Sequence, residues 1–92
     1  MSIDIHHESV AHRFEASVEG VLCVLDYTLL HGILTITHTI VPEVVGGRGI
    51  AANLVKFALD HARAEHWKVV PACSYAEAWM RRHPEYDDLR VG

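Results

Sequence analysis

Apolar and polar residues alternate along the first half of the chain in a way that predicts strands. Residues 12–19 switch between the two kinds at every position, which is the period of a half-buried strand. Residues 21–30 are more apolar and predict a more buried strand, and residues 33–41 are mostly β-branched and predict a third. Short turns at Glu19-Gly20 and His31-Gly32 make these three strands an antiparallel meander.

The second half of the chain changes to a helical period. Residues 48–66 place apolar side chains at intervals of three and four, which predicts a helix with one buried face. The predicted core-facing positions are Ile50, Leu54, Phe57, Ala58 and His61 or Ala62.

A short strand and a second helix complete the predicted order. Residues 67–71 predict a fourth strand, and Ser74-x-x-Glu77 reads as a capping box that opens a helix ended by Pro84. Residues 86–92 are interpreted as a tail. The order βββαβα predicts an α+β fold whose last strand, reached through the first helix, lies parallel to its neighbour.

Composition limits the classes of function. The length of 92 residues predicts one domain, residues 1–92. A net charge of −4 argues against nucleic acid as a partner, because phosphate contacts need a basic patch. No apolar run approaches the ~20 residues of a membrane span, and no signal peptide is evident, so we expect a cytoplasmic protein.

Histidine and cysteine are the residues that could hold a metal. The chain has eight histidines, but they are scattered, and Cys23 and Cys73 show no metal-type spacing. We therefore expect no metal site, and a histidine-rich metal-binding protein is only a third interpretation.

The glycine-rich turn in residues 41–56 is the strongest sign of a binding site. Gly47-x-Gly49-x-Ala51 stands where the first helix should begin. Glycines let the backbone approach a bound group, and the unpaired N–H groups at a helix start favour an anion. Arg48 adds a positive charge. The structural alternative is a tight connection that only needs glycine's backbone freedom.

Four segments together resemble a known superfamily. These are Thr39-Ile40-Val41-Pro42, Gly47-Arg48-Gly49-Ile50-Ala51, Pro71-Ala72-Cys73-Ser74-Tyr75 and Arg82-His83-Pro84-Glu85-Tyr86. They resemble the short, single-domain group of the GNAT superfamily, the acyl-CoA-dependent N-acetyltransferases, over residues 3 to 90. In the superfamily pattern Arg/Gln-x-x-Gly-x-Gly/Ala, Gly49 and Ala51 match, whereas Gly46 stands at the Arg/Gln position.

The resemblance implies acetyl-CoA as cosubstrate and a place for it. In the superfamily, acyl-CoA lies in a V-shaped split between two parallel strands, here residues 33–41 and 67–71. It implies that pantetheine pairs with the backbone of Ile40 and Val41. The pyrophosphate would then lie on the turn and the start of the helix, at Gly46, Gly47, Arg48, Gly49, Ile50 and Ala51.

Cys73 and His38 are the candidate catalytic residues. Cys73 precedes the predicted cap Ser74, and a helix N-terminus favours the thiolate form of a thiol. His38 shares a predicted strand face with Ile36 and Ile40, and an ordinary histidine pKa near 6.5 suits a general base. The alternatives are a buried structural thiol and a hydrogen-bonded core histidine. Cys23, Trp67 and Trp79 are interpreted as structural residues. Tyr75 and Tyr86 are interpreted as packing residues, with donation of a proton as the alternative for each.

The predicted activity is acetyl transfer from acetyl-CoA to an amine of a small molecule, a lysine or an N-terminus. Larger superfamily members carry extra helices between their first strands that shape the acceptor site. This chain connects these strands directly through Glu19-Gly20. The acceptor site is therefore open, completed by a protein partner or a second copy, or absent. In the last case the chain would be an acyl-CoA-binding or interaction module without turnover.

Overall fold

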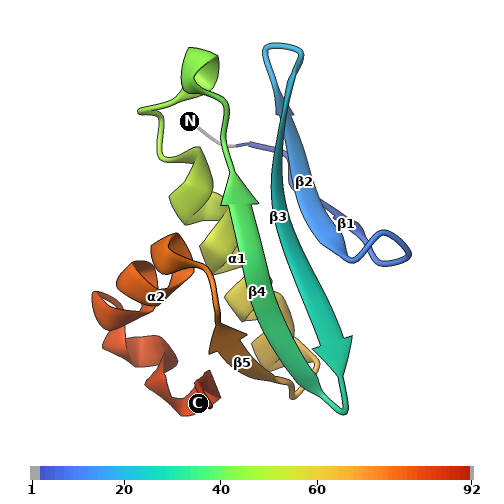
Figure 1. Ribbon diagram of the computed structural model, residues 1–92, viewed down its shortest axis with the longest axis vertical. Coiled ribbons are helices and arrows are strands. Elements are labelled where there is room, and N and C mark those ends of the chain that lie inside the picture. The colour runs from blue at the N-terminus through green and yellow to red at the C-terminus, as the bar shows by residue number, and fades with distance from the viewer. Residues whose placement is uncertain (1–2, 92) are drawn as a thin grey trace.

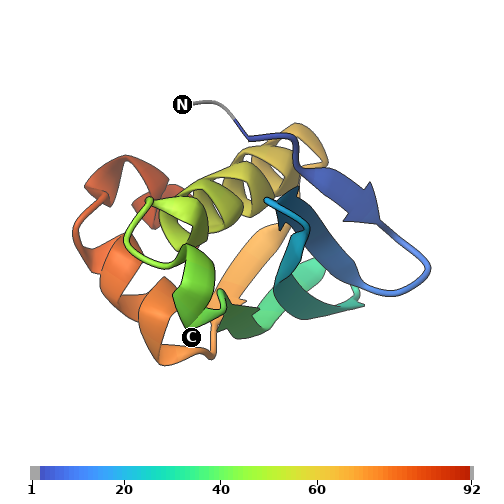
Figure 2. The ribbon, with the colours of Figure 1, turned by 90° about the horizontal axis from the view of Figure 1, so that it is seen from above.

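The fold is a five-stranded sheet with its helices packed on one face, as Figures 1 and 2 show. The computed structural model describes residues 3–91. The elements are β1 His6–Glu8, β2 Arg13–Val18, β3 Val21–Leu30, β4 Ile33–Ile40, η1 Glu43–Val45, α1 Ile50–Ala64, β5 Lys68–Pro71, α2 Ser74–Arg81 and η2 Pro84–Leu89.

The strands lie in sequence order across the sheet. Strands β1 to β4 are antiparallel to one another, and β5 pairs parallel with β4 after the crossover through α1. The predicted α+β class and the meander–helix–parallel strand–helix order are confirmed. The sequence analysis missed β1, whose three residues are too few to show an alternating pattern.

The core lies between the sheet and the two helices. Phe14, Leu25 and Leu34 from the strands are fully buried against the apolar face of α1. The predicted helix face is confirmed at Ile50, Leu54, Ala58 and Ala62. It is wrong for Phe57, which is 40% exposed because it lies at the margin of the buried stripe.

The residues after α2 fold back onto the sheet and α1. Tyr86 and Leu89 of η2 are buried, and the Tyr86 hydroxyl donates a 2.6 Å hydrogen bond to Asp60 Oδ1. The Val91 N–H donates to the Val69 carbonyl at 2.9 Å, on the side of β5 away from β4. The interpretation of residues 86–92 as a tail was wrong through residue 91.

A bulge in β4 changes which side chains face the helices. Asp26 pairs with His38 and Tyr27 with Ile36, so Thr37 is an extra residue on β4. Ile36 and Thr39 therefore lie opposite Tyr27 and Leu25, which belong to the core between the sheet and the helices. His38 and Ile40 lie on the other, uncovered face. The prediction that His38 shares a face with Ile36 was wrong, because it assumed an uninterrupted period of two.

Within residues 3–91, no helix is long and apolar enough to cross a membrane.

Candidate functional site

A split opens in the sheet where β4 and β5 stop pairing. The last paired residues are Ile36 of β4 and Pro71 of β5. Beyond them, the N–H groups of Ala72 and Cys73 both donate to the Ile36 carbonyl at 3.0 Å, and the chain turns into α2. Because β4 runs on to Ile40, its last residues pass beyond the end of β5 (Figure 1). β4 and β5 are the two strands between which the resemblance implies that acyl-CoA lies.

The glycine-rich turn borders a hollow beside this split. Gly47 and Gly49 have φ angles of +76° and +74°, a conformation that side chains rarely adopt. A Cβ atom built on either glycine would meet no atom within 4 Å, so both backbones face open space. The hollow has a volume of about 360 Å³ and is lined by Val41, Gly46, Gly47, Gly49, Ile50, Ala51 and Tyr75.

The start of α1 is suited to an anion. Gly49 is the N-cap residue and offers no side-chain oxygen, and the first turn of the helix holds no acidic residue. The carbonyl of Gly49 accepts hydrogen bonds from the backbone N–H of Asn53 at 3.1 Å and from its Nδ2 at 2.9 Å. No side chain caps the first N–H groups of this helix, which suits them to bind an anion.

Arg48 and Gly46 differ from what the sequence suggested. The Arg48 guanidinium forms a two-pronged ion pair with Glu19 in the β2–β3 turn. Hydrogen bonding to Arg48 lowers the pKa of the Glu19 carboxyl, and the same contact raises the pKa of Arg48. Gly46 has an ordinary negative φ, and its N–H donates to the Glu43 carbonyl at 2.9 Å. Arg48 is therefore held by a carboxylate of the chain itself.

Cys73 is the N-cap residue of α2. Its Sγ accepts a hydrogen bond from the Ala76 N–H at 3.4 Å and lies 3.5 Å from Thr39 Oγ1. The prediction of Ser74 as the cap was wrong, because the chain becomes helical one residue earlier than the capping-box pattern indicated. Glu77 instead forms ion pairs with Arg81 and Arg90.

His38 lies on the uncovered face of the sheet and is exposed. Its cross-strand neighbour is Asp26, whose Oδ1 accepts a 3.0 Å hydrogen bond from Arg13 Nε. Cys73, in contrast, meets Thr39 on the helix side of β4. The structure thus places the two candidate catalytic residues near the same strand end but toward opposite faces of the sheet.

Two polar residues near the hollow were not selected from the sequence. Tyr75, interpreted as a packing residue, is 37% exposed and lines the hollow. Thr39 meets the Cys73 sulfur. Both residues belong to segments that carry the resemblance, and for Tyr75 the phenol, which could donate a proton, was a second signal in the sequence. Packing roles are confirmed for Tyr86 and Trp79, and burial raises the pKa of the Cys23 thiol, which favours its protonated form.

Among residues 3–91, no group of three or more His, Cys, Asp or Glu side chains is arranged to hold a metal ion.

Comparisons with known proteins agree on one family. The family model described as GCN5-related N-acetyl-transferase matches residues 13–89. Protein NATD1 of Gallus gallus and of Mus musculus are each 32% identical over 85 residues, which cover 89% of this chain and 77% of theirs. A GCN5-like protein from Staphylococcus aureus, solved by NMR, superimposes with a TM-score of 0.77 at 26% identity over 100% of this chain and 92% of its own. The chain therefore belongs to the GCN5-related N-acetyl-transferase family.

Proposed function

We propose that this protein transfers an acetyl group from acetyl-CoA to an amine. The observation that carries the proposal is the uncapped start of α1 behind Gly47 and Gly49, beside the split between β4 and β5. An anion-binding helix end and an unpaired strand edge are what a phosphorylated thioester with an amide-containing arm requires.

The residues present fit such a cosubstrate. The backbone at Gly46, Gly47, Gly49, Ile50 and Ala51 would hold the pyrophosphate, and the open edge of β4 at Ile40 and Val41 would pair with the pantetheine amides. Bound acetyl-CoA supplies the activated acetyl group. Arg48 would contribute a positive charge to this site after exchanging Glu19 for a phosphate.

In a direct route the amine attacks the thioester from the uncovered face. His38 is on that face and accepts the proton that the amine must lose. The new C–N bond forms, the C–S bond breaks, and the thiolate that leaves is protonated on the helix side. Tyr75, whose side chain lines the hollow there, is the proposed source of that proton.

In a covalent route Cys73 takes the acetyl group first. The sulfur lies at a helix start, where the Ala76 N–H and Thr39 Oγ1 are within hydrogen-bond reach of it. The Cys73 sulfur attacks the acetyl carbon, the C–S bond to CoA breaks, and the proton of the thiol goes to the departing CoA sulfur. The amine then attacks the acetyl-cysteine, forming the amide and restoring the thiol.

A binding module without turnover is the second candidate. It is favoured by the placement of Cys73 and His38 toward opposite faces of the sheet and by the short Glu19-Gly20 connection, which builds no acceptor wall. A second copy or a protein partner on the uncovered face is the proposed source of that wall if turnover occurs.

Intact-mass spectrometry and an amine panel test these proposals. The protein is incubated with acetyl-CoA alone, and then with small amines and peptides. We expect acetyl-CoA binding, acetylated product, and a loss of turnover of about 10²-fold or more in His38→Ala, the size of a general-base contribution. His6→Ala, an exposed histidine on β1, is the control.

The outcomes separate the routes. An acetyl adduct on Cys73 that passes to an amine supports the covalent route, and full turnover in Cys73→Ala excludes it. Binding without product across the panel supports the module. Absence of acetyl-CoA binding overturns both functions.

A further inference from the structure

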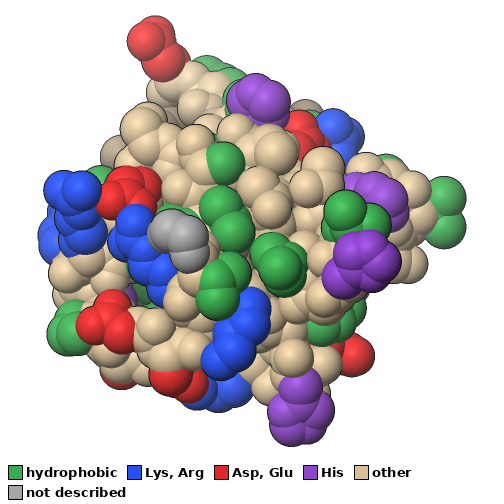
Figure 3. All heavy atoms as spheres, turned by 60° about the horizontal axis from the view of Figure 1, so that its bottom comes forward, with side chains coloured by type: hydrophobic (Ala, Val, Ile, Leu, Met, Phe, Trp, Pro, Cys, Tyr) green, Lys and Arg blue, Asp and Glu red, His purple; other side chains and the backbone are tan. Residues whose placement is uncertain are grey.

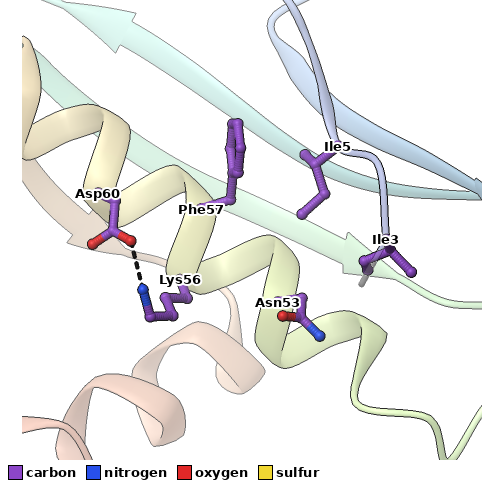
Figure 4. A pocket seen from close by; sticks show the side chains of 6 residues that line it. All are labelled: Ile3, Ile5, Asn53, Lys56, Phe57 and Asp60. Carbon is purple, nitrogen blue, oxygen red and sulfur yellow. Dashed lines mark hydrogen bonds and ion pairs between the residues drawn. The ribbon is translucent and has the colours of Figure 1, made fainter. Parts of the chain in front are cut away.

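The segment Ile3–Glu8 crosses the outer side of α1 on its way into β1. Its residues alternate, with Ile3, Ile5 and His7 half-buried and the residues between them exposed. Figure 4 shows Ile3 and Ile5 beside the exposed part of α1. The contact is loose, because a hollow of about 210 Å³ remains there, lined by Ile3, Ile5, Asn53, Lys56, Phe57 and Asp60.

His7 is the residue that fastens this segment. Its ring stacks on Phe14 of β2 with centroids 4.3 Å apart and planes 15° apart. Its Nε2 lies 2.6 Å from the Tyr27 hydroxyl of β3, and its ring meets the edge of His61 of α1 at 4.6 Å. One side chain therefore joins β1 to two strands and a helix, whereas the β1–β2 ladder adds only three residue pairs.

The environment of His7 favours the neutral ring. Burial lowers its pKa below the ordinary value of 6.5, and the neighbouring His61 lowers it further. Glu65, the C-cap residue of α1, and Glu8 of β1 act in the opposite direction but do not reverse the shift. A proton on His7 thus opposes burial of the ring, and a proton on His61 would repel it.

The side chains that meet this cluster from the other elements are aromatic or histidine rings, which do not stabilise a positive charge as a carboxylate would. β3 contributes the Tyr27 hydroxyl, β2 contributes the uncharged Phe14, and the turn before β2 contributes His12, whose ring is 5.6 Å from Tyr27. Trp67, the residue before β5, contributes a ring whose centroid is 5.3 Å from that of His61.

We propose that Ile3–Glu8 is a pH-sensitive strap, attached to β2 and α1 while His7 is neutral and released when His7 is protonated. A histidine whose folded pKa is depressed binds its proton better when released. The attachment is therefore complete above pH 6.5 and weakens as pH falls below 6.5 toward the lower pKa of the attached ring. Release uncovers an apolar surface that includes Phe57 on α1.

Backbone NMR of the whole chain tests the proposal. The {1H}–15N NOE is measured for the strap, β3 and α1 at about pH 7.5 and about pH 5, on either side of a histidine titration. We expect the strap amides to lose their NOE at the lower pH, while β3 and α1 keep theirs. His7→Phe, which keeps the ring but cannot titrate, should remain attached at both values. His6→Gln should behave as the wild type, because that neighbouring histidine points outward.

Unchanged strap amides in the wild type, or the same release in His7→Phe, would overturn the proposal. If His7→Phe does not fold, the proposal can still be tested on the wild-type protein alone. The His7 ring resonance, followed with pH, should titrate below 6.5 and with the same midpoint as the strap amides. Different midpoints would also overturn it. None of these readouts depends on acetyl transfer.

Discussion

Gly49 has two separate reasons to be glycine. Its φ of +74° disfavours side chains, and the open space in front of its Cα is part of the proposed pyrophosphate site. These reasons make different predictions for different substitutions, because asparagine tolerates a positive φ and valine does not.

We predict that Gly49→Asn folds but binds acetyl-CoA at least tenfold more weakly, since its side chain enters the space left for the phosphates. The loss corresponds to about 1.4 kcal/mol of binding free energy. Calorimetric titration measures it, and thermal unfolding of the same sample shows that the fold is intact. Gly20→Asn, at another positive-φ glycine in the β2–β3 turn, is the control. Equal affinities in the two variants would place the cosubstrate elsewhere.

For single residues, the sequence predicted those features that depend only on residues nearby in the chain. The glycine turn follows from local spacing, and its positive φ angles were found where expected. The ion pair between Arg48 and Glu19 could not be predicted, since it joins residues 29 positions apart and depends on how two turns meet in space.

The second helix shows how a one-residue error changes the meaning of a motif. The Ser74-x-x-Glu77 pattern suggested Ser74 as the cap, but Cys73 holds that position and Ser74 is the first helical residue. A thiol is a weaker acceptor than a hydroxyl, so a serine at position 73 should cap the helix better.

We predict that Cys73→Ser raises the free energy of unfolding by roughly 0.5 kcal/mol, whereas Ser74→Ala changes it by less than about 0.5 kcal/mol. Urea denaturation followed by circular dichroism measures both. A loss of about 1 kcal/mol in Ser74→Ala would restore the capping-box interpretation. Because Cys73→Ser also removes the thiol, it separates a capping role from a role in acetyl transfer.

At the scale of elements, periodicity predicted the strands and helices that are long enough to show it. The meander, α1, β5 and α2 were all found, with α1 two residues shorter at each end than predicted. Strand β1 was missed because it is short, and η2 because 3₁₀ turns have no amphipathic period. The bulge at Thr37 left no sign, because both of its possible registers place β-branched residues against the core.

The η2 segment, most of which was expected to be a tail, packs against both helices. Tyr86 packs on Trp79, with ring centroids 5.5 Å apart, and its hydroxyl bonds to Asp60 on α1. Burial is the first cause that raises the pKa of this hydroxyl, and the Asp60 carboxylate raises it further. The Tyr86 phenol therefore stays neutral, and remains a hydrogen-bond donor, throughout the physiological pH range.

We predict that Tyr86→Phe lowers the free energy of unfolding by about 1 kcal/mol, the net value of one partly buried hydrogen bond. For a domain of this size the midpoint of thermal unfolding should fall by about 4–8 °C. Differential scanning calorimetry measures the shift. Tyr75→Phe, at an exposed position, should leave the midpoint nearly unchanged. Equal shifts would show that the bond to Asp60 does not stabilise the fold.

In the proposed reaction, the extra residue in β4 would also decide from which side of the sheet each reactant approaches. Because Thr37 is an extra residue, the consecutive residues His38 and Thr39 lie on opposite faces of the sheet, next to the place where the pairing with β5 ends. Acetyl-CoA and the amine would then approach from opposite faces of the sheet and meet at the end of β4. The protein would not need an enclosed active-site cavity. Deleting Thr37 would reverse the alternation of side chains after Ile36. The His38 imidazole and the Thr39 hydroxyl would then exchange faces of the sheet, although neither group is itself changed.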